Sequence, residues 1–99
     1  MNLRIYIIFM IDSTYIPKKR ADVILQEVDG ESLILDNNTQ EIHQLNDTAT
    51  FIWQRCTGNN SIANIISQVI KNYDISDDSA RADVLGVISN LKDLKLLDE

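Results

Sequence analysis

The dipeptide Asp29-Gly30 is the feature that most constrains the fold of this chain. It separates two runs rich in aliphatic residues, VILQEV at Val23–Val28 and ESLILD at Glu31–Asp36. A two-residue Asp-Gly loop between such runs is the strongest short-range signal for a β-hairpin, because both central residues of a type I′ turn need positive φ. The sequence therefore predicts two antiparallel strands over these ranges.

A third strand is predicted after a second turn. Residues 37–40 read NNTQ, and asparagine tolerates the left-handed backbone that tight turns require. The short run EIHQL follows at Glu41–Leu45. Two successive tight turns predict a three-stranded antiparallel meander.

Two helices are predicted next along the chain. The first begins after Asn46 as its N-cap and ends before Gly58, where a helix needs a left-handed terminator. The apolar face of this helix comprises Ala49, Ile52, Trp53 and Cys56. Ser61 caps the second helix. Its apolar stripe, at full helical spacing, comprises Ile62, Ile65, Ile66, Val69, Ile70 and Tyr73.

The third predicted helix has a core row and a second row beside it. Residues 74–79, DISDDS, supply its cap and the negative charge at its start. The core row comprises Ala80, Val84, Val87, Leu91 and Leu94. The neighbouring row comprises Arg81, Leu85, Ile88, Lys92 and Lys95. Because this row is mixed in character at the edge of the buried stripe, we expect a groove there; the alternative is that Leu85 and Ile88 only widen the core contact.

Residues 1–20 are expected to form an extension before the domain proper, which we place at residues 21–99. The apolar run LRIYIIFMI at residues 3–11 is far shorter than the roughly 20 residues of a membrane-spanning helix, and no small-residue cleavage site follows it. It is typical of a strand or an exposed arm, and pairing through it would give a homodimer. Met10 is an alternative start that would remove most of this run.

Size and charge restrict the classes of function. A chain of 99 residues with 44% apolar composition predicts one domain with one core. It carries 9 basic and 15 acidic residues, and its only basic run is at residues 18–20. An acidic surface opposes the phosphate contacts of nucleic-acid binding. A single cysteine excludes an internal disulfide and suits a reducing compartment, so we expect a cytoplasmic protein and no membrane insertion.

Candidate catalytic and metal-binding residues are few. His43 and Cys56 are the only pair that resembles a base and a thiol nucleophile, but the helical face on which Cys56 lies favours a small buried hydrophobe. One histidine and one cysteine fall short of a four-ligand zinc site. Asp74, Asp77 and Asp78 lack the alternating ligands and the glycine of a calcium loop. We therefore expect no enzyme, no metal and no cofactor.

The ordered set of motifs resembles the PqqD-like family, the pyrroloquinoline quinone biosynthesis protein D group with its RiPP precursor-peptide recognition elements. The resemblance rests on EVDGESLILD at residues 27–36, LNDTATFIW at 45–53, YDI at 73–75 and DVLGVISNLKDLKLL at 83–97. The chain departs from the family pattern where Gln40, Ala49 and Lys95 replace glycines. Ile42 and His43 stand where the family commonly has aromatic residues.

The resemblance implies an α+β, winged-helix-like domain that is not a catalyst. Such a domain captures the leader of a ribosomally made precursor peptide and presents it to a maturation enzyme, such as a radical S-adenosylmethionine enzyme, a cyclodehydratase or a lasso-type protease. The peptide lies as an added strand against the third strand, in the cleft shared with the third helix. The site residues implied here are Glu41, Ile42, His43, Gln44, Leu45, Arg81, Val84, Leu85, Ile88 and Lys92.

Two other functions stay open on the sequence alone. The first is a DNA-binding winged helix, although its last helix would offer only Arg81, Lys92 and Lys95 among acidic residues. The second is a structural subunit that binds a modifying enzyme and no peptide. His43 on an edge strand either hydrogen-bonds a bound peptide or is simply tolerated there.

Overall fold

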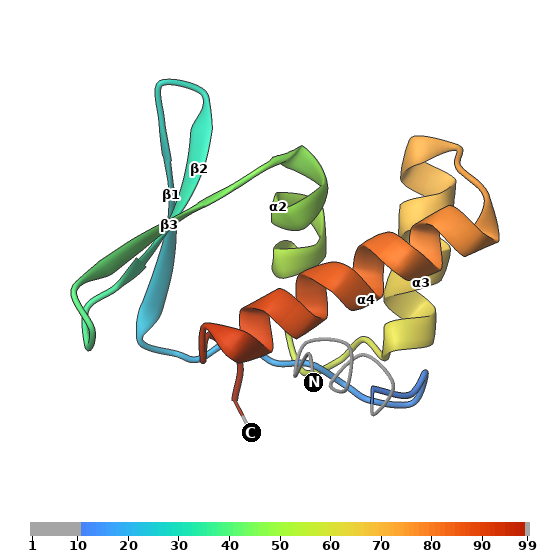
Figure 1. Ribbon diagram of the computed structural model, residues 1–99, viewed down its shortest axis with the longest axis horizontal. Helices are drawn as coiled ribbons and strands as arrows, with labels where there is room; N and C mark the ends of the chain where they lie inside the picture. Colours follow the sequence, from blue (N-terminus) through green and yellow to red (C-terminus); the bar gives the residue numbers. More distant parts are fainter. Residues whose placement is uncertain (1–10, 99) are drawn as a thin grey trace, which may run out of the picture.

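Three antiparallel strands followed by three helices make up the computed structural model, which describes residues 11–98 (Figure 1). The strands are β1 (Val23–Val28), β2 (Glu31–Asp36) and β3 (Glu41–Leu45), in the spatial order β1-β2-β3. The helices are α2 (Asp47–Gln54), α3 (Ile62–Tyr73) and α4 (Asp77–Asp93). This is the predicted α+β meander with its three helices.

The turn between β1 and β2 is the predicted tight two-residue hairpin. Asp29 has φ of 52° and Gly30 has φ of 80°, and Val28 pairs with Glu31 across them. In the turn before β3, Gln40 also has a positive φ, of 61°. The hairpin geometry fixes a register in which Ile34 of β2 pairs with His43 of β3.

Each helix begins at a polar cap. Asn46 Oδ1 accepts a hydrogen bond from the Ala49 amide at 2.8 Å, and Ser61 Oγ accepts one from the Asn64 amide at 3.2 Å. Both caps are as predicted. In the DISDDS segment the cap is Ser76, whose side chain accepts a hydrogen bond from the backbone N–H of Ser79. The acidic residues of the first turn of α4 then complement its dipole.

The core lies mainly among the three helices, and the sheet contributes Ile34 and Leu45 to it. Its largest completely buried side chains include Trp53, Ile34 and Ile52. Of the four predicted apolar residues, Ala49, Ile52 and Trp53 are buried in α2, and Cys56 is buried just after the helix ends. In α3 the buried residues are Ile62, Ile65, Ile66 and Val69, with Ile70 and Tyr73 partly buried at the margin.

The buried stripe of α4 is rotated relative to the predicted one. Its buried apolar residues are Ala80, Val84, Ile88 and Leu91, whereas Val87 and Leu94 are only partly buried. The stripe therefore runs through Ile88, which the sequence had placed at a border. Packing against both α2 and α3 covers a wider arc of α4 than one neighbour would.

The predicted boundary at residue 21 is wrong for residues 11–20, because this segment packs on the domain. Ile11 and Pro17 are buried. Six backbone hydrogen bonds tie the segment to residues after position 55, for example Lys19 N–H to the Cys56 carbonyl at 2.9 Å and Arg20 N–H to the Leu96 carbonyl at 3.0 Å. The expected strand or arm before Ile11, the alternative start at Met10 and dimerisation through that run lie outside the described residues.

Candidate functional site

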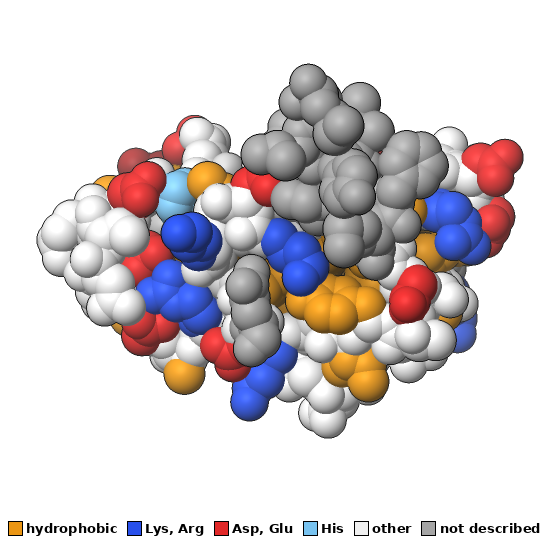
Figure 2. Space-filling model, turned by 60° about the horizontal axis from the view of Figure 1, so that its bottom comes forward, with side chains coloured by type: hydrophobic (Ala, Val, Ile, Leu, Met, Phe, Trp, Pro, Cys, Tyr) orange, Lys and Arg blue, Asp and Glu red, His pale blue; other side chains and the backbone are white. Residues whose placement is uncertain are grey.

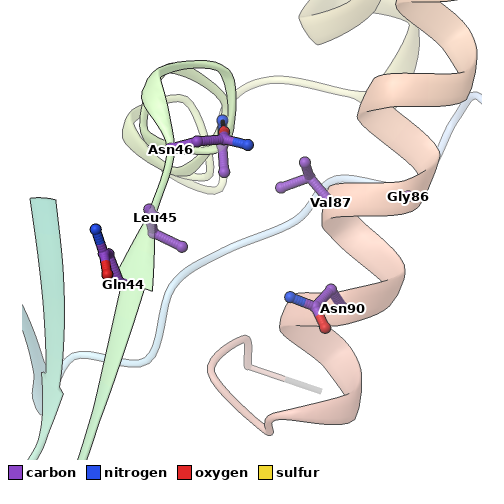
Figure 3. A pocket seen from close by; sticks show the side chains of 7 residues that line it. Gln44, Leu45, Asn46, Gly86, Val87 and Asn90 are labelled. Carbon is purple, nitrogen blue, oxygen red and sulfur yellow. Dashed lines mark hydrogen bonds between the residues drawn. The ribbon is translucent and has the colours of Figure 1, made fainter.

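The outer edge of β3 is the first component of the candidate site. Within residues 11–98, β2 is the only strand that pairs with β3. In Figure 3, β2 lies along one side of β3 and α4 lies beyond the other side. An edge strand presents backbone N–H and C=O groups at every second residue. The expected free strand edge at Glu41–Leu45 is therefore present within the described part of the chain.

A pocket of about 390 Å³ lies between the end of β3, the start of α2 and the middle of α4. In Figure 3 the side chains of Val87 and Asn90 project from α4 toward Leu45 of β3. No charged residue is among the residues that line this pocket. They are Gln44, Leu45, Asn46, Ala49, Gly86, Val87 and Asn90.

Two of the residues expected on the α4 side of the site do not face a groove. The side chains of Val84 and Ile88 are completely buried in the core, with 0% exposure. An Ile88→Asp substitution would place a charge in the core and would test folding instead of binding. The expectation that Ile88 borders an open groove is therefore wrong.

The other predicted α4 residues lie elsewhere on the helix. Lys92 Nζ is 4.4 Å from the centre of the Tyr15 ring, on the side of the N-terminal segment. Leu85 is seven residues before Lys92 and so shares that border of the helix, packed against the core. Arg81 is exposed and lies 4.0 Å from Asp77 in the first turn.

A helical stripe has two borders, and the one beside β3 carries different residues. Gly86, Val87 and Asn90 lie on this border. Sequence reasoning missed them because periodicity alone does not say which border meets the sheet. The available signal was Gly86 itself, a glycine in the interior of a helix.

The five residues of β3 divide between the two faces of the sheet. Glu41, His43 and Leu45 share the inner face, where Leu45 is buried. The imidazole Nε2 of His43 is buried without a hydrogen-bond partner. Ile42, on the outer face, is 65% exposed. The predicted strand residues therefore lie together along one edge, but their side chains point in two directions.

Arg20 joins the sheet to the end of α4. Its guanidinium donates to the carboxylate of Asp36 at 3.0 Å, to Asp22 at 2.7 Å and to the Lys95 carbonyl at 2.9 Å. Hydrogen bonds from Arg20 lower the pKa of Asp36 and of Asp22 below 3.8, despite the opposing effect of desolvation. Because Asp36 ends β2 and Lys95 follows α4, this cluster ties the sheet to the end of α4.

The arrangement around Cys56 does not support thiol catalysis. Burial raises the pKa of the Cys56 thiol to about 12, and its Sγ donates to the Ile52 carbonyl at 3.3 Å. The reactive form of cysteine is the thiolate, which this environment suppresses. Among residues 11–98 no group of three His, Cys, Asp or Glu side chains is placed to hold a metal ion. No helix in this range combines the length and hydropathy of a membrane span.

Comparison with known proteins places this architecture in a family. The sequence profile described as coenzyme PQQ synthesis protein D (PqqD) matches residues 31–97, which is more than half of the chain. The chain belongs to the PqqD family. A search of curated protein sequences finds no match to this PqqD-family chain.

Solved structures share the fold of this PqqD-family chain. A lasso peptide synthetase B1 complexed with the leader peptide is 25% identical, with a TM-score of 0.75 over 86% of this chain and 100% of that one. TbiB1 in complex with the TbiA(beta) leader peptide is 18% identical, with a TM-score of 0.72 over 82% and 94%. The PqqD truncation of Methylobacterium extorquens PqqCD, a stand-alone RiPP recognition element, is 19% identical, with a TM-score of 0.74 over 89% and 94%.

Proposed function

We propose that this chain is a non-catalytic module that captures the leader of a ribosomally made precursor peptide and presents it to a maturation enzyme. The leader adds as a strand to the free edge of β3, between β3 and α4. The observation that carries the proposal is the coincidence of a strand edge that no strand of residues 11–98 pairs with and a pocket at its end. Membership of the PqqD family and the two neighbours solved with leader peptides support it.

The energetics require both parts of this site. Four or five backbone hydrogen bonds at about 1 kcal/mol net each give roughly 5 kcal/mol before ordering costs. A micromolar complex needs about 8 kcal/mol. Burial of one or two leader side chains, at about 1.5–3 kcal/mol each, closes the difference. The pocket beside β3 supplies such burial, and this is why we prefer the β3 edge to the β1 edge.

The direct test is titration with leader peptides. Synthetic N-terminal segments of precursor peptides encoded beside this gene are titrated by calorimetry, and amide hydrogen exchange is followed in the complex. We expect micromolar or tighter binding and slowed exchange along Glu41–Leu45, with little change along Val23–Val28. Protection that falls on β1 instead would contradict the β3 site.

A pair of variants on α4 tests which border of the helix forms the site. Val87 and Leu85 are both partly buried, but only Val87 lines the pocket. Val87→Glu places a charge where the leader packs, so we expect at least about tenfold weaker binding. Leu85→Glu is the matched control, with a comparable loss of thermal stability and unchanged leader affinity. Weaker leader binding by Leu85→Glu with unchanged binding by Val87→Glu would show that the leader binds at the Leu85 border of α4 instead.

DNA binding is disfavoured by the use this fold makes of its basic residues. The guanidinium of Arg20 is bonded to Asp22 and Asp36, and Lys19 Nζ lies 5.4 Å from the centre of the Trp53 ring. Figure 2 shows Lys and Arg side chains set among Asp and Glu on this face, with no continuous basic surface. Retention of duplex DNA in a low-salt gel shift would contradict the peptide-binding proposal.

The proposal extends to the setting in which the chain works. We place it in the cytoplasm, where precursor peptides are synthesised and where the single thiol, at Cys56, stays reduced. Its protein partner is an enzyme that modifies the captured peptide. A structural subunit without peptide binding predicts enzyme binding in pull-downs and no heat in the leader titration.

A further inference from the structure

Gly86 occupies an unusual place for a glycine. It lies in the middle of α4, where glycine is the least favourable residue after proline because it loses the most backbone entropy on folding. The glycines with positive φ among residues 11–98 are Gly30 and Gly58, so the backbone at Gly86 does not require a glycine. An alanine at this position would make the helix more stable.

Packing within the domain does not require a glycine there either. Apart from its chain neighbours and the backbone of its own helix, a Cβ added at Gly86 would meet no heavy atom within 4 Å. By contrast, a Cβ at Gly58 would come within 3.2 Å of the Lys18 side chain. The space beside Gly86 is therefore open, and it is part of the pocket between β3 and α4.

The pocket is large enough for more than one methyl group. A cavity of about 150 Å³ accommodates benzene, and this pocket measures about 390 Å³. Leu45, Ala49 and Val87 form its apolar part, and carboxamide side chains complete it. With no charged lining residue, it offers no compensation for burial of a charged group.

We propose that Gly86 keeps this pocket open for one large uncharged side chain of the bound leader, and so determines which leaders are accepted. This inference rests on the proposed function and adds to it a specificity position and the class of side chain recognised. The absent side chain at residue 86 leaves room for the ligand, at a cost to the helix.

The test uses the full chain and a displayed library of short random peptides. Selection with the unmodified chain is expected to enrich sequences with an aromatic or large aliphatic residue at one fixed position. Gly86→Leu fills the pocket, and we expect it to bind those peptides at least about tenfold more weakly. Ala63→Leu is the control, because it adds a side chain at an exposed position of α3 away from the pocket.

A second arm shows whether the two side chains share one site. Replacing the enriched large residue of the peptide by alanine should weaken binding to the unmodified chain by tenfold and leave binding to Gly86→Leu almost unchanged. Gly86→Ala, which adds a single methyl group, should remain folded and show a smaller loss. Equal enrichment by the unmodified chain and Gly86→Leu would overturn this inference alone. Failure of the unmodified chain to enrich any sequence would overturn the proposed function, and this inference with it.

Discussion

Lys95 is a residue with a side chain in a left-handed backbone conformation that favours glycine. It has a φ of 59°, and it closes α4 in a Schellman motif: Leu96 N–H donates to the Leu91 carbonyl and Lys95 N–H donates to the Lys92 carbonyl, both at 3.0 Å. A left-handed conformation costs a non-glycine residue about 1 kcal/mol. Gln40, in the turn before β3, is also left-handed, with φ of 61°.

We predict that Lys95→Gly stabilises the domain by about 0.5–1 kcal/mol, because the strain at positive φ exceeds the entropy that glycine loses. Urea denaturation monitored by circular dichroism measures this. Lys71→Gly is the matched control, since Lys71 lies in the last turn of α3 with helical backbone, and there glycine should cost about 1 kcal/mol. A destabilised Lys95→Gly variant would contradict the argument.

Cys56 gives a second prediction at this scale. With its thiol buried and its pKa raised to about 12, the residue should not react with a disulfide reagent at pH 8 in the native protein. Reaction should become complete in guanidinium chloride. Absorbance of the released thiolate follows the reaction. Rapid modification of the folded chain would show that the thiol is accessible.

At the scale of elements, the Arg20 cluster joins three parts of the chain that are far apart in the sequence. Arg20 connects the N-terminal segment to the end of β2 through Asp36 and to the end of α4 through Lys95. Asp36 is 2% exposed, so its charge depends on this partner. Because β2 pairs with β3, we expect this ion pair to help hold the sheet against the end of α4.

We predict that this ion pair makes stability fall on acidification. The pKa of Asp36 is lowered from 3.8 in the folded state, so its contribution is present above pH 3.8 and is lost as the pH falls through its native pKa. Asp36→Asn should lower Tm by about 5 °C or more at pH 7, and the difference from the unmodified chain should narrow toward pH 3. Thermal denaturation across this range measures it.

The control uses the partner of the same ion pair. Arg20→Gln should reproduce the effect at pH 7, and the double variant should be no less stable than the worse single variant, because both changes remove one interaction. A constant difference in Tm from pH 7 to pH 3 would indicate that packing, not charge, explains the loss.

At the scale of the whole molecule, residues 11–20 belong to the fold. They lie across the ends of α2, α3 and α4 and close the core through Ile11 and Pro17 (Figure 1). Six backbone hydrogen bonds of about 1 kcal/mol each are comparable to the 5–15 kcal/mol that stabilises a typical domain. The segment is therefore not a separable linker.

We predict that a chain beginning at Ala21 does not fold, whereas one beginning at Met10 does. Loss of the segment exposes Trp53 and removes the partner of Asp36. Circular dichroism and the cooperativity of thermal unfolding distinguish the two chains. A cooperative transition within a few degrees of the full chain for the shorter protein would restore the boundary at residue 21.

The local order of elements was determined by the sequence, and the identity of the binding surface was decided by the tertiary structure. Asp29-Gly30, Asn46 and Ser61 encode turns and caps through short-range hydrogen bonds and φ preferences, so these elements were predictable. The border of α4 that meets β3 was not, because helical periodicity defines a buried stripe but not its rotation. Packing of α4 against α2, α3 and the N-terminal segment placed Ile88 in the core and left Gly86 and Val87 beside the open edge.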